Sequence, residues 1–319
     1  MSPRSELFLL YPQEVGPAEH TDEFLESSMQ IQTDVSQQKR AKKRSKKSSK
    51  KTRAKKKTQA ELADPHALYE RAVQDPKTDA AALGKLYRRV RKRAAKLMRE
   101  DFCGTGSLSA AWVNGGKERS AYGVDLDRPT LDWGLENNVA PMSAGLAKRI
   151  TLVEGNVLTQ RGPKADIACA LNFSYCCLKD RKSLVTYFKN VRKNLAKDGV
   201  FVMDVLGGSD TMGPDENRHD LGGFTYRWKQ HFFDPLTHDF RCTISFFFDD
   251  GSKISPAFEY DWRLWTMPEL CDALEEAGFS GTHRMWEKTD KKGNGTGEFD
   301  EPKRVENQES WWTYLIAER

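Results

Sequence analysis

From Asp64 to the C-terminus, hydrophobic positions alternate between two spacings. Apolar residues at helical spacing predict an amphipathic helix over residues 180–197, and similar patterns predict helices near 64–74, 78–95, 108–113, 129–138 and 267–277. Short apolar runs between these segments predict strands at 96–99, 119–124, 150–153, 167–171 and 200–206. This alternation predicts an α/β fold, a Rossmann-like doubly wound sheet of seven strands covered by helices.

The region 224–265 follows a different pattern. Three aromatic-rich runs alternate between apolar and polar positions, and the turn dipeptides Asp234-Pro235 and Asp250-Gly251 lie between them. They predict a small antiparallel β insertion that covers the carboxyl end of the sheet as a lid. Final strands are expected at 283–287 and 311–317, and a mobile loop at 289–303.

Charge separates the chain into two parts. Residues 39–57 contain thirteen of the 51 Lys and Arg residues and no acid, and the rest of the chain has a formal charge of −8. Such a dense block of like charge predicts a disordered N-terminal extension over 1–60, ahead of a folded domain at 64–319. Any non-specific contact with nucleic acid would therefore be made through residues 39–57.

Composition excludes other classes of protein. No apolar run approaches the ~20 residues of a membrane span, so no membrane association is expected. The first residues lack the pattern of a secretory signal, and the six cysteines show neither CxxC pairs nor zinc-like spacing. They are interpreted as buried thiols, and no metal site is expected. A cytoplasmic location is predicted, or a nuclear one in a eukaryote, where the lysine clusters would serve as an import signal.

The segment 99–108, REDFCGTGSL, contains the most informative motif. Gly104 and Gly106 lie in a turn between a strand and a helix, where the backbone can approach a ligand closely. Asp125 ends the next strand, nineteen residues after Gly106, where a Rossmann-type site binds a ribose. Ser109 replaces the third glycine of a dinucleotide fingerprint, which disfavours a nicotinamide dehydrogenase, and no P-loop motif is present.

This arrangement resembles the first motif of class I S-adenosylmethionine-dependent methyltransferases, although Phe102 replaces the usual first glycine. YGVDLD at 122–127, EGNVL at 154–158, LNFSY at 171–175 and VFVMDVLGG at 200–208 resemble four further motifs in the family's order. The resemblance implies S-adenosylmethionine as cofactor, with Asp125 on the ribose and Asp127 as a helper. The cofactor-binding residues that it implies are Glu100, Cys103, Gly104, Thr105, Gly106, Asp125, Leu126, Asn156, Val157 and Asn172.

The chain resembles more narrowly those small-molecule-type members that have a three-stranded insertion after the fifth strand. This similarity extends over Trp262 to Phe279 and says little about the substrate. The family resemblance implies methyl transfer by in-line displacement, and the aromatic lid expected over the cleft favours a small-molecule acceptor over a polynucleotide. Candidate catalytic residues are Asn172, Tyr175, Tyr226 and His231, with Tyr260 and Trp262 also considered. His231 could instead be a structural histidine, and Tyr260 and Trp262 could be core residues. Two alternative functions remain open: an RNA methyltransferase tethered by the basic run, and a non-catalytic nucleic-acid-binding protein.

Overall fold

A mixed sheet forms the centre of the computed structural model, which describes residues 56–291 and 295–319. Within these residues the sheet has eight strands in the order β11–β10–β12–β5–β4–β1–β2–β3. The five strands from β3 to β5 are parallel, and β12, β10 and β11 are antiparallel to their neighbours. Their bounds are β1 (Leu97–Asp101), β2 (Ser120–Asp125), β3 (Ile150–Glu154), β4 (Ala165–Ala170), β5 (Leu195–Gly207), β10 (Gly281–Thr289), β11 (Gly295–Asp300) and β12 (Trp311–Glu318).

The strand order reverses next to β1. The chain proceeds from β1 outward to β2 and β3, and then returns to place β4 on the other side of β1. In doubly wound sheets such a reversal opens a crevice at the carboxyl ends of the two strands, where ligands bind. The predicted Rossmann-like, doubly wound fold is confirmed.

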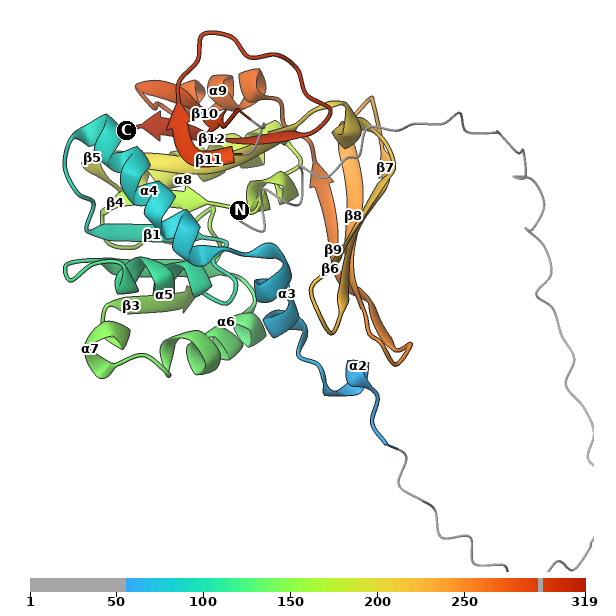
Figure 1. The fold of residues 1–319 in the computed structure, drawn as a ribbon. Coiled ribbons are helices and arrows are strands. Elements are labelled where there is room, and N and C mark those ends of the chain that lie inside the picture. The colour runs from blue at the N-terminus through green and yellow to red at the C-terminus, as the bar shows by residue number, and fades with distance from the viewer. Residues whose placement is uncertain (1–55, 292–294) are drawn as a thin grey trace, which may run out of the picture. The chain divides into compact units, whose positions relative to one another are not determined.

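Helices cover both faces of the sheet (Figure 1). On β5, Val200 and Val202 pack into the cluster with α4 and α5, whereas Phe201 and Met203 pack into the cluster with α8 and α9. Because both faces are covered, the strand is apolar at nearly every position. The helices are α4 (Pro76–Arg91), α5 (Ser107–Asn114), α6 (Arg128–Gly134) with its π-helical continuation η1 (Leu135–Val139), α7 (Ala144–Ala147), α8 (Arg181–Asn194), α9 (Met267–Glu276), and the 3-10 turns η2 (Ser174–Cys177) and η3 (Ser209–Met212).

A second, antiparallel sheet has the order β6–β7–β8–β9, and we call it the small sheet. One of its faces packs on α3 through a separate apolar cluster, and Figure 1 shows α3 between this sheet and the parallel sheet. The predicted insertion is therefore present. Its elements are β6 (Asp215–Asp220), β7 (Thr225–Phe233), β8 (Asp239–Phe247) and β9 (Lys253–Arg263), and α3 is Pro65–Val73.

Helical structure begins earlier than the sequence predicts. Asp64 caps α3 as expected, with Pro65 in the first turn. Ahead of it, Thr58 caps the short helix α2 (Gln59–Leu62), and the backbone N–H of Gln59 donates to Asp250 in the β8–β9 turn. The extension predicted to be disordered covers residues 1–60. Residues 1–55 of it lie outside the described residues, and for Gln59 and Ala60 the prediction was wrong because both lie in α2.

Three predicted details were wrong. The main sheet gains an eighth strand because β11 pairs with β10 inside the segment expected to be a mobile loop. The small sheet has four strands rather than three because β6, with the sequence DENRHD, pairs with β7. An edge strand of charged residues has no apolar alternation that could reveal it. Helix α8 ends at Asn194 rather than Lys197, and β5 begins at once with Leu195.

The composition led to two expectations, that the chain has no membrane-spanning segment and that its cysteines are buried thiols. None of the helices in the described part is long and apolar enough to cross a membrane. All six cysteines lie in described residues and are free thiols. Four of them are buried, but Cys177 is exposed and Cys271 is half-buried, so the prediction of six buried thiols was wrong for these two.

Candidate functional site

The loop that follows β1, residues 102–106, lies at the strand-order reversal, and we call it the cofactor loop. Phe102, Gly104 and Gly106 all have positive φ, at 58°, 52° and 67°. This backbone makes a tight turn from β1 into α5, closed by the hydrogen bond from the Gly106 N–H to the Cys103 carbonyl at 2.8 Å. At Gly106 a side chain would also collide with Leu152, since a Cβ atom there would lie 2.8 Å from its Cδ1. A side chain at this position would therefore be strained and would require Leu152 to move.

Asp125 links the cofactor loop to β2. Its Oδ2 accepts a hydrogen bond of 2.7 Å from the Gly104 N–H, and its Oδ1 accepts one of 3.0 Å from the Asp127 N–H. Each carboxylate oxygen can accept a further hydrogen bond, as a ribose hydroxyl would require. The neighbouring Leu126 is 66% exposed, so an apolar surface is available beside the carboxylate.

The loops after β2 and β3 contain three further residues considered from the sequence: Asp127, Asn156 and Val157. Asp127 caps α6 by accepting from the Thr130 N–H at 3.0 Å, which gives it a structural role. Asn156 and Val157 follow β3; the Asn156 Oδ1 accepts from the Leu158 N–H, and Val157 is buried. They therefore lie in the loop after the strand next to β2, where the resemblance places the adenine contact.

Asn172 lies two residues after the end of β4, the strand on the other side of β1 from β2. Asn172 and Phe173 have φ of 59° and 57°, a left-handed backbone that is uncommon outside glycine. Their N–H groups donate to the two carboxylate oxygens of Asp204 at 2.8 and 2.9 Å. Asp204 is fully buried on β5. This buried carboxylate holds the turn in place.

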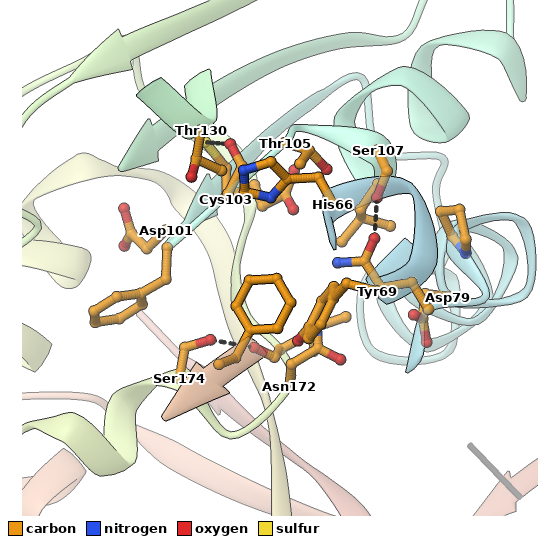
Figure 2. A pocket seen from close by; sticks show the side chains of 18 of the residues that line it. His66, Tyr69, Asp79, Asp101, Cys103, Thr105, Ser107, Thr130, Asn172 and Ser174 are labelled. Carbon is orange, nitrogen blue, oxygen red and sulfur yellow. Dashed lines mark hydrogen bonds between the residues drawn. The ribbon is translucent and has the colours of Figure 1, made fainter. Parts of the chain in front are cut away.

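A pocket opens between these loops, α3 and the small sheet. Figure 2 shows side chains from α3, from the cofactor loop and from the turn after β4 around one hollow. Five of the ten predicted cofactor residues line it: Glu100, Cys103, Gly104, Thr105 and Asn172. Gly106, Asp125, Leu126, Asn156 and Val157 are not among its lining residues and lie along the same edge of the sheet.

The lining of this pocket is acidic and aromatic. It includes Asp79, Glu100 and Asp101, and its residues, all within the described chain, include no Lys or Arg. Glu100 is buried and accepts a hydrogen bond of 2.5 Å from the Ser109 hydroxyl, and burial raises the pKa of its carboxyl to about 8. Burial also raises the pKa of Asp101, against the opposing effect of its 2.8 Å ion pair with Arg99.

The predicted catalytic residues are not all brought together. Asn172 lines the pocket, but Tyr175 and Tyr226 are each 1% exposed and belong to two different apolar clusters. Burial raises the pKa of both hydroxyls well above the usual range, which disfavours them as bases. His231 is exposed on β7, with its Nε2 2.9 Å from the Thr243 hydroxyl, and does not line the pocket.

Sequence analysis did not identify several aromatic residues that line the pocket. His66 and Tyr69 lie one turn apart on α3, and Phe258 lies on β9 next to Tyr260, which was considered. The Phe258 ring centroid is 6.1 Å from that of His66 and 5.0 Å from that of Tyr69. The i, i+3 spacing of His66 and Tyr69 shows that they share a helix face, but not what that face contacts. Trp262, by contrast, is 7% exposed and part of a core cluster.

The described part of the chain contains no candidate metal-binding cluster. Among residues 56–291 and 295–319, no group of three or more His, Cys, Asp or Glu side chains is placed to hold an ion.

Known proteins resemble the chain in fold. Neither a protein-family model nor a curated protein sequence matches it. Among solved structures, a S-adenosylmethionine-dependent methyltransferase from Clostridium acetobutylicum ATCC 824 matches with a TM-score of 0.60 and 19% identity, over 79% of this chain and 96% of that one. The CcbJ methyltransferase from Streptomyces caelestis matches with a TM-score of 0.57 and 20% identity, over 77% and 96% of the two chains.

A third match is CalS10, an amino pentose methyltransferase from Micromonospora echinaspora, solved with S-adenosylmethionine bound. Its TM-score is 0.57 at 15% identity, over 80% of this chain and 95% of that one. At such identities the likeness concerns the fold. The chain thus has the fold of S-adenosylmethionine-dependent methyltransferases, as its motifs predicted, with the candidate site at the strand-order reversal.

Proposed function

We propose that the protein is an S-adenosylmethionine-dependent methyltransferase that acts on a small molecule. The observation that carries the proposal is the connection of the cofactor loop to Asp125 by the hydrogen bond from Gly104. This contact joins the glycine turn after β1 to the acid that ends β2, the two motifs on which the sequence resemblance depends. Both lie at the strand-order reversal, where ligands bind in this class of sheet.

The residues at this edge fit such a cofactor. In the proposal, Asp125 binds the ribose hydroxyls, and Leu126, Asn156 and Val157 surround the adenine. The glycines of the cofactor loop leave room for the methionine part, and Glu100 provides a carboxyl group near its ammonium. A buried carboxyl with a raised pKa ionises more readily once a cation lies beside it, so binding would favour its charged form.

Asn172 is the residue that we propose to face the transferred methyl group. When bound, the cofactor would supply a methyl group on a positively charged sulfur: the acceptor's lone pair would bond to the methyl carbon as the carbon–sulfur bond opposite it breaks, with S-adenosylhomocysteine as the leaving group and the acceptor's proton released to solvent. Because this leaving group is already activated, the protein mainly positions the two reactants. The rigid turn at Asn172, held by Asp204, and the aromatic side chains of α3 and β9 would provide that positioning.

The charged groups that line the pocket limit which chemical classes of methyl acceptor could bind there. Its lining includes carboxyl groups and aromatic rings but neither Lys nor Arg, so no side-chain cation of the lining is available to pair with a phosphate group of the acceptor. A site that binds a polynucleotide needs basic side chains to pair with the phosphates of the nucleic acid. We therefore favour a small acceptor without a phosphate group, such as a hydroxyl compound or an amine that reacts in its unprotonated form. Tethering to RNA through residues 39–57 remains the alternative to be tested.

Ligand-induced stabilisation tests the cofactor. S-adenosylmethionine and S-adenosylhomocysteine should each raise the free energy of unfolding by about 2.7 kcal/mol at a hundred times their dissociation constant. NAD should have no effect. An equal response to NAD, or no response to the two methionine derivatives, would contradict the proposal.

The acceptor is tested by incubating the protein with methyl-labelled S-adenosylmethionine. Panels of small amines, alcohols and carboxylic acids are compared with total RNA. Label should enter an amine or hydroxyl compound. Label that enters RNA alone would favour the tethered RNA enzyme.

A further inference from the structure

Helix α3 lies between the two parts of the candidate site. One side of the helix packs into the apolar cluster of the small sheet through Leu68, Tyr69, Ala72 and Val73. The other side contacts the cofactor loop and the start of α5. The helix is thus in contact with both the predicted cofactor side and the aromatic side of the pocket.

Glu70 connects α3 to the cofactor loop. Its Oε1 accepts a hydrogen bond of 2.5 Å from the Thr105 hydroxyl and one of 2.7 Å from the Asn138 side-chain amide. The same amide donates to the Thr105 carbonyl at 3.1 Å. Three elements, α3, the cofactor loop and η1, therefore meet at one half-buried carboxylate. A second link joins the C-terminal end of α3 to the start of α5, where the Ser107 hydroxyl donates to the Gln74 side chain at 2.5 Å.

The close approach of η1 and α6 to the loop depends on a glycine. At Gly134 a Cβ atom would lie 2.1 Å from the Thr105 carbonyl oxygen, so any side chain would force the helix and the loop apart. Thr105 is accordingly held from two sides, by the packed helix and by Glu70.

Tyr69, the residue before Glu70, connects α3 to the small sheet. Its side chain shares a hydrogen bond with Tyr260 of β9, and its ring centroid lies 5.0 Å from that of Phe258. Phe258 and Tyr260 both line the pocket. Arg71 adds a contact to the β6–β7 turn, where it donates to the carbonyls of Leu221 and Gly222.

We propose that α3 couples the cofactor loop to the acceptor side of the pocket, with Glu70 and Tyr69 as positioning residues. This inference rests on the proposed function. Glu70 contacts the cofactor loop and the adjacent Tyr69 contacts β9. A molecule that orders the loop at Thr105 would therefore also order α3 through Glu70, and α3 would order β9 through Tyr69. Binding on one side must then strengthen binding on the other by the same factor, because such coupling is reciprocal.

The first experiment measures the affinity for S-adenosylhomocysteine by calorimetry in three variants of the full chain. Glu70→Ala removes the acceptor of both hydrogen bonds and should weaken binding about tenfold. Glu70→Gln keeps an amide oxygen at the same position and should restore most of the affinity. Glu136→Ala removes an exposed glutamate of η1 and should bind like the wild type.

The second experiment follows hydrogen exchange with and without saturating S-adenosylhomocysteine. In the wild type, the ligand should slow exchange in the cofactor loop, in α3 and in β9. In Tyr69→Phe, which keeps the ring but lacks the hydroxyl, protection of the loop should remain and protection of β9 should fall by about half or more. A merely structural role for Tyr69 would lower protection equally with and without the ligand.

The outcomes separate this inference from the proposed function. If the wild type binds no S-adenosylhomocysteine, both are overturned. If it binds and Glu70→Ala binds equally well, or if the ligand protects β9 to the same extent in wild type and Tyr69→Phe, the coupling is overturned and the cofactor assignment stands. Melting temperatures without ligand show whether each variant is folded.

Discussion

The Asp125 carboxylate accepts a hydrogen bond of 2.7 Å from the backbone N–H of Gly104. This contact joins two segments that are 21 residues apart, at the carboxyl ends of the neighbouring strands β1 and β2. The acid therefore has a structural role of its own. It holds the cofactor loop in the conformation that the proposed function requires.

The first prediction concerns this acid. Asp125→Ala should weaken binding of S-adenosylhomocysteine by roughly 2–4 kcal/mol, the value of two charge-assisted hydrogen bonds to the ribose. Loss of the Gly104 contact should also lower the melting temperature slightly. Calorimetry and thermal unfolding measure both effects. Asp132→Ala serves as the control, since Asp132 is an exposed acid paired with Arg128 on α6. Unchanged affinity in a folded Asp125→Ala variant would mean that another group binds the ribose.

The second prediction concerns Glu100, whose carboxyl has a pKa of about 8 in the folded protein against a usual value near 4.5. Between these pH values the folded protein retains a proton that the unfolded chain has lost. The free energy of unfolding should therefore decrease as the pH rises through this window, by up to about 1.4 kcal/mol per pH unit. Below the unfolded-state pKa both states hold the proton, so stability does not depend on the pH through Glu100 and none of it has been lost.

Glu100→Gln removes this titration and retains an oxygen that can accept from Ser109. Denaturant unfolding from pH 5 to pH 8 should show a flatter profile for the variant and higher stability than the wild type at pH 8. Glu136→Gln changes an exposed carboxyl and should leave the profile unchanged. Parallel profiles for wild type and Glu100→Gln would show that Glu100 is ionised throughout.

Much of the fold could be predicted from the sequence because periodic burial leaves a visible pattern. The strand at β5 and the helix at α8 have apolar residues at nearly every core position, and both were predicted within a few residues. The edge strands β6 and β11 were missed because their own residues are mostly polar and show no apolar alternation. Their pairing comes from the neighbouring strands β7 and β10 rather than from any local pattern.

The positions of Gly104 and Gly106 in the turn after β1 and of Asp125 at the end of β2 could be predicted from the sequence, whereas their role in binding stays a prediction. The aromatic lining could not be predicted, because His66 and Tyr69 face Phe258 across nearly 190 residues of sequence. The roles of Glu70 and Asp204 were equally invisible. Each carboxylate binds groups of a distant loop, and such contacts depend on how the elements pack together.

The third prediction concerns Phe102, which has φ of 58° where the resembled motif has glycine. Its ring packs edge-on against Tyr187, with centroids 5.5 Å apart. Replacing Phe102 by Ala should remove this packing and keep the unfavourable backbone. Replacing it by Gly should remove the packing but tolerate the backbone. Phe102→Gly should therefore be more stable than Phe102→Ala by about 1 kcal/mol, the reverse of the usual order within regular structure.

Denaturant unfolding of the two variants measures this difference. Both should still bind S-adenosylhomocysteine, since glycine at this position belongs to the motif that the sequence resembles. Equal stability of the two variants would show that the loop relaxes once the ring is removed.

The last prediction concerns the basic run. Removing residues 1–55 takes away eleven of its thirteen Lys and Arg residues and keeps Thr58, which caps α2, and Gln59, which contacts Asp250. The shortened protein should keep the melting temperature and the S-adenosylhomocysteine affinity of the full chain. Affinity for RNA should fall steeply, and its dependence on salt between about 50 and 200 mM should flatten, because fewer phosphate contacts release fewer counterions.

A full-length variant with the Lys and Arg residues of 39–55 replaced by Gln separates charge from length, and it should lose RNA affinity to the same extent. The small-molecule proposal requires that both proteins keep methyl transfer, because no residue that lines the pocket has been removed. If methyl transfer is lost in both, and the intact protein labels RNA, the basic run is needed to hold the substrate. The tethered RNA methyltransferase would then be the correct function.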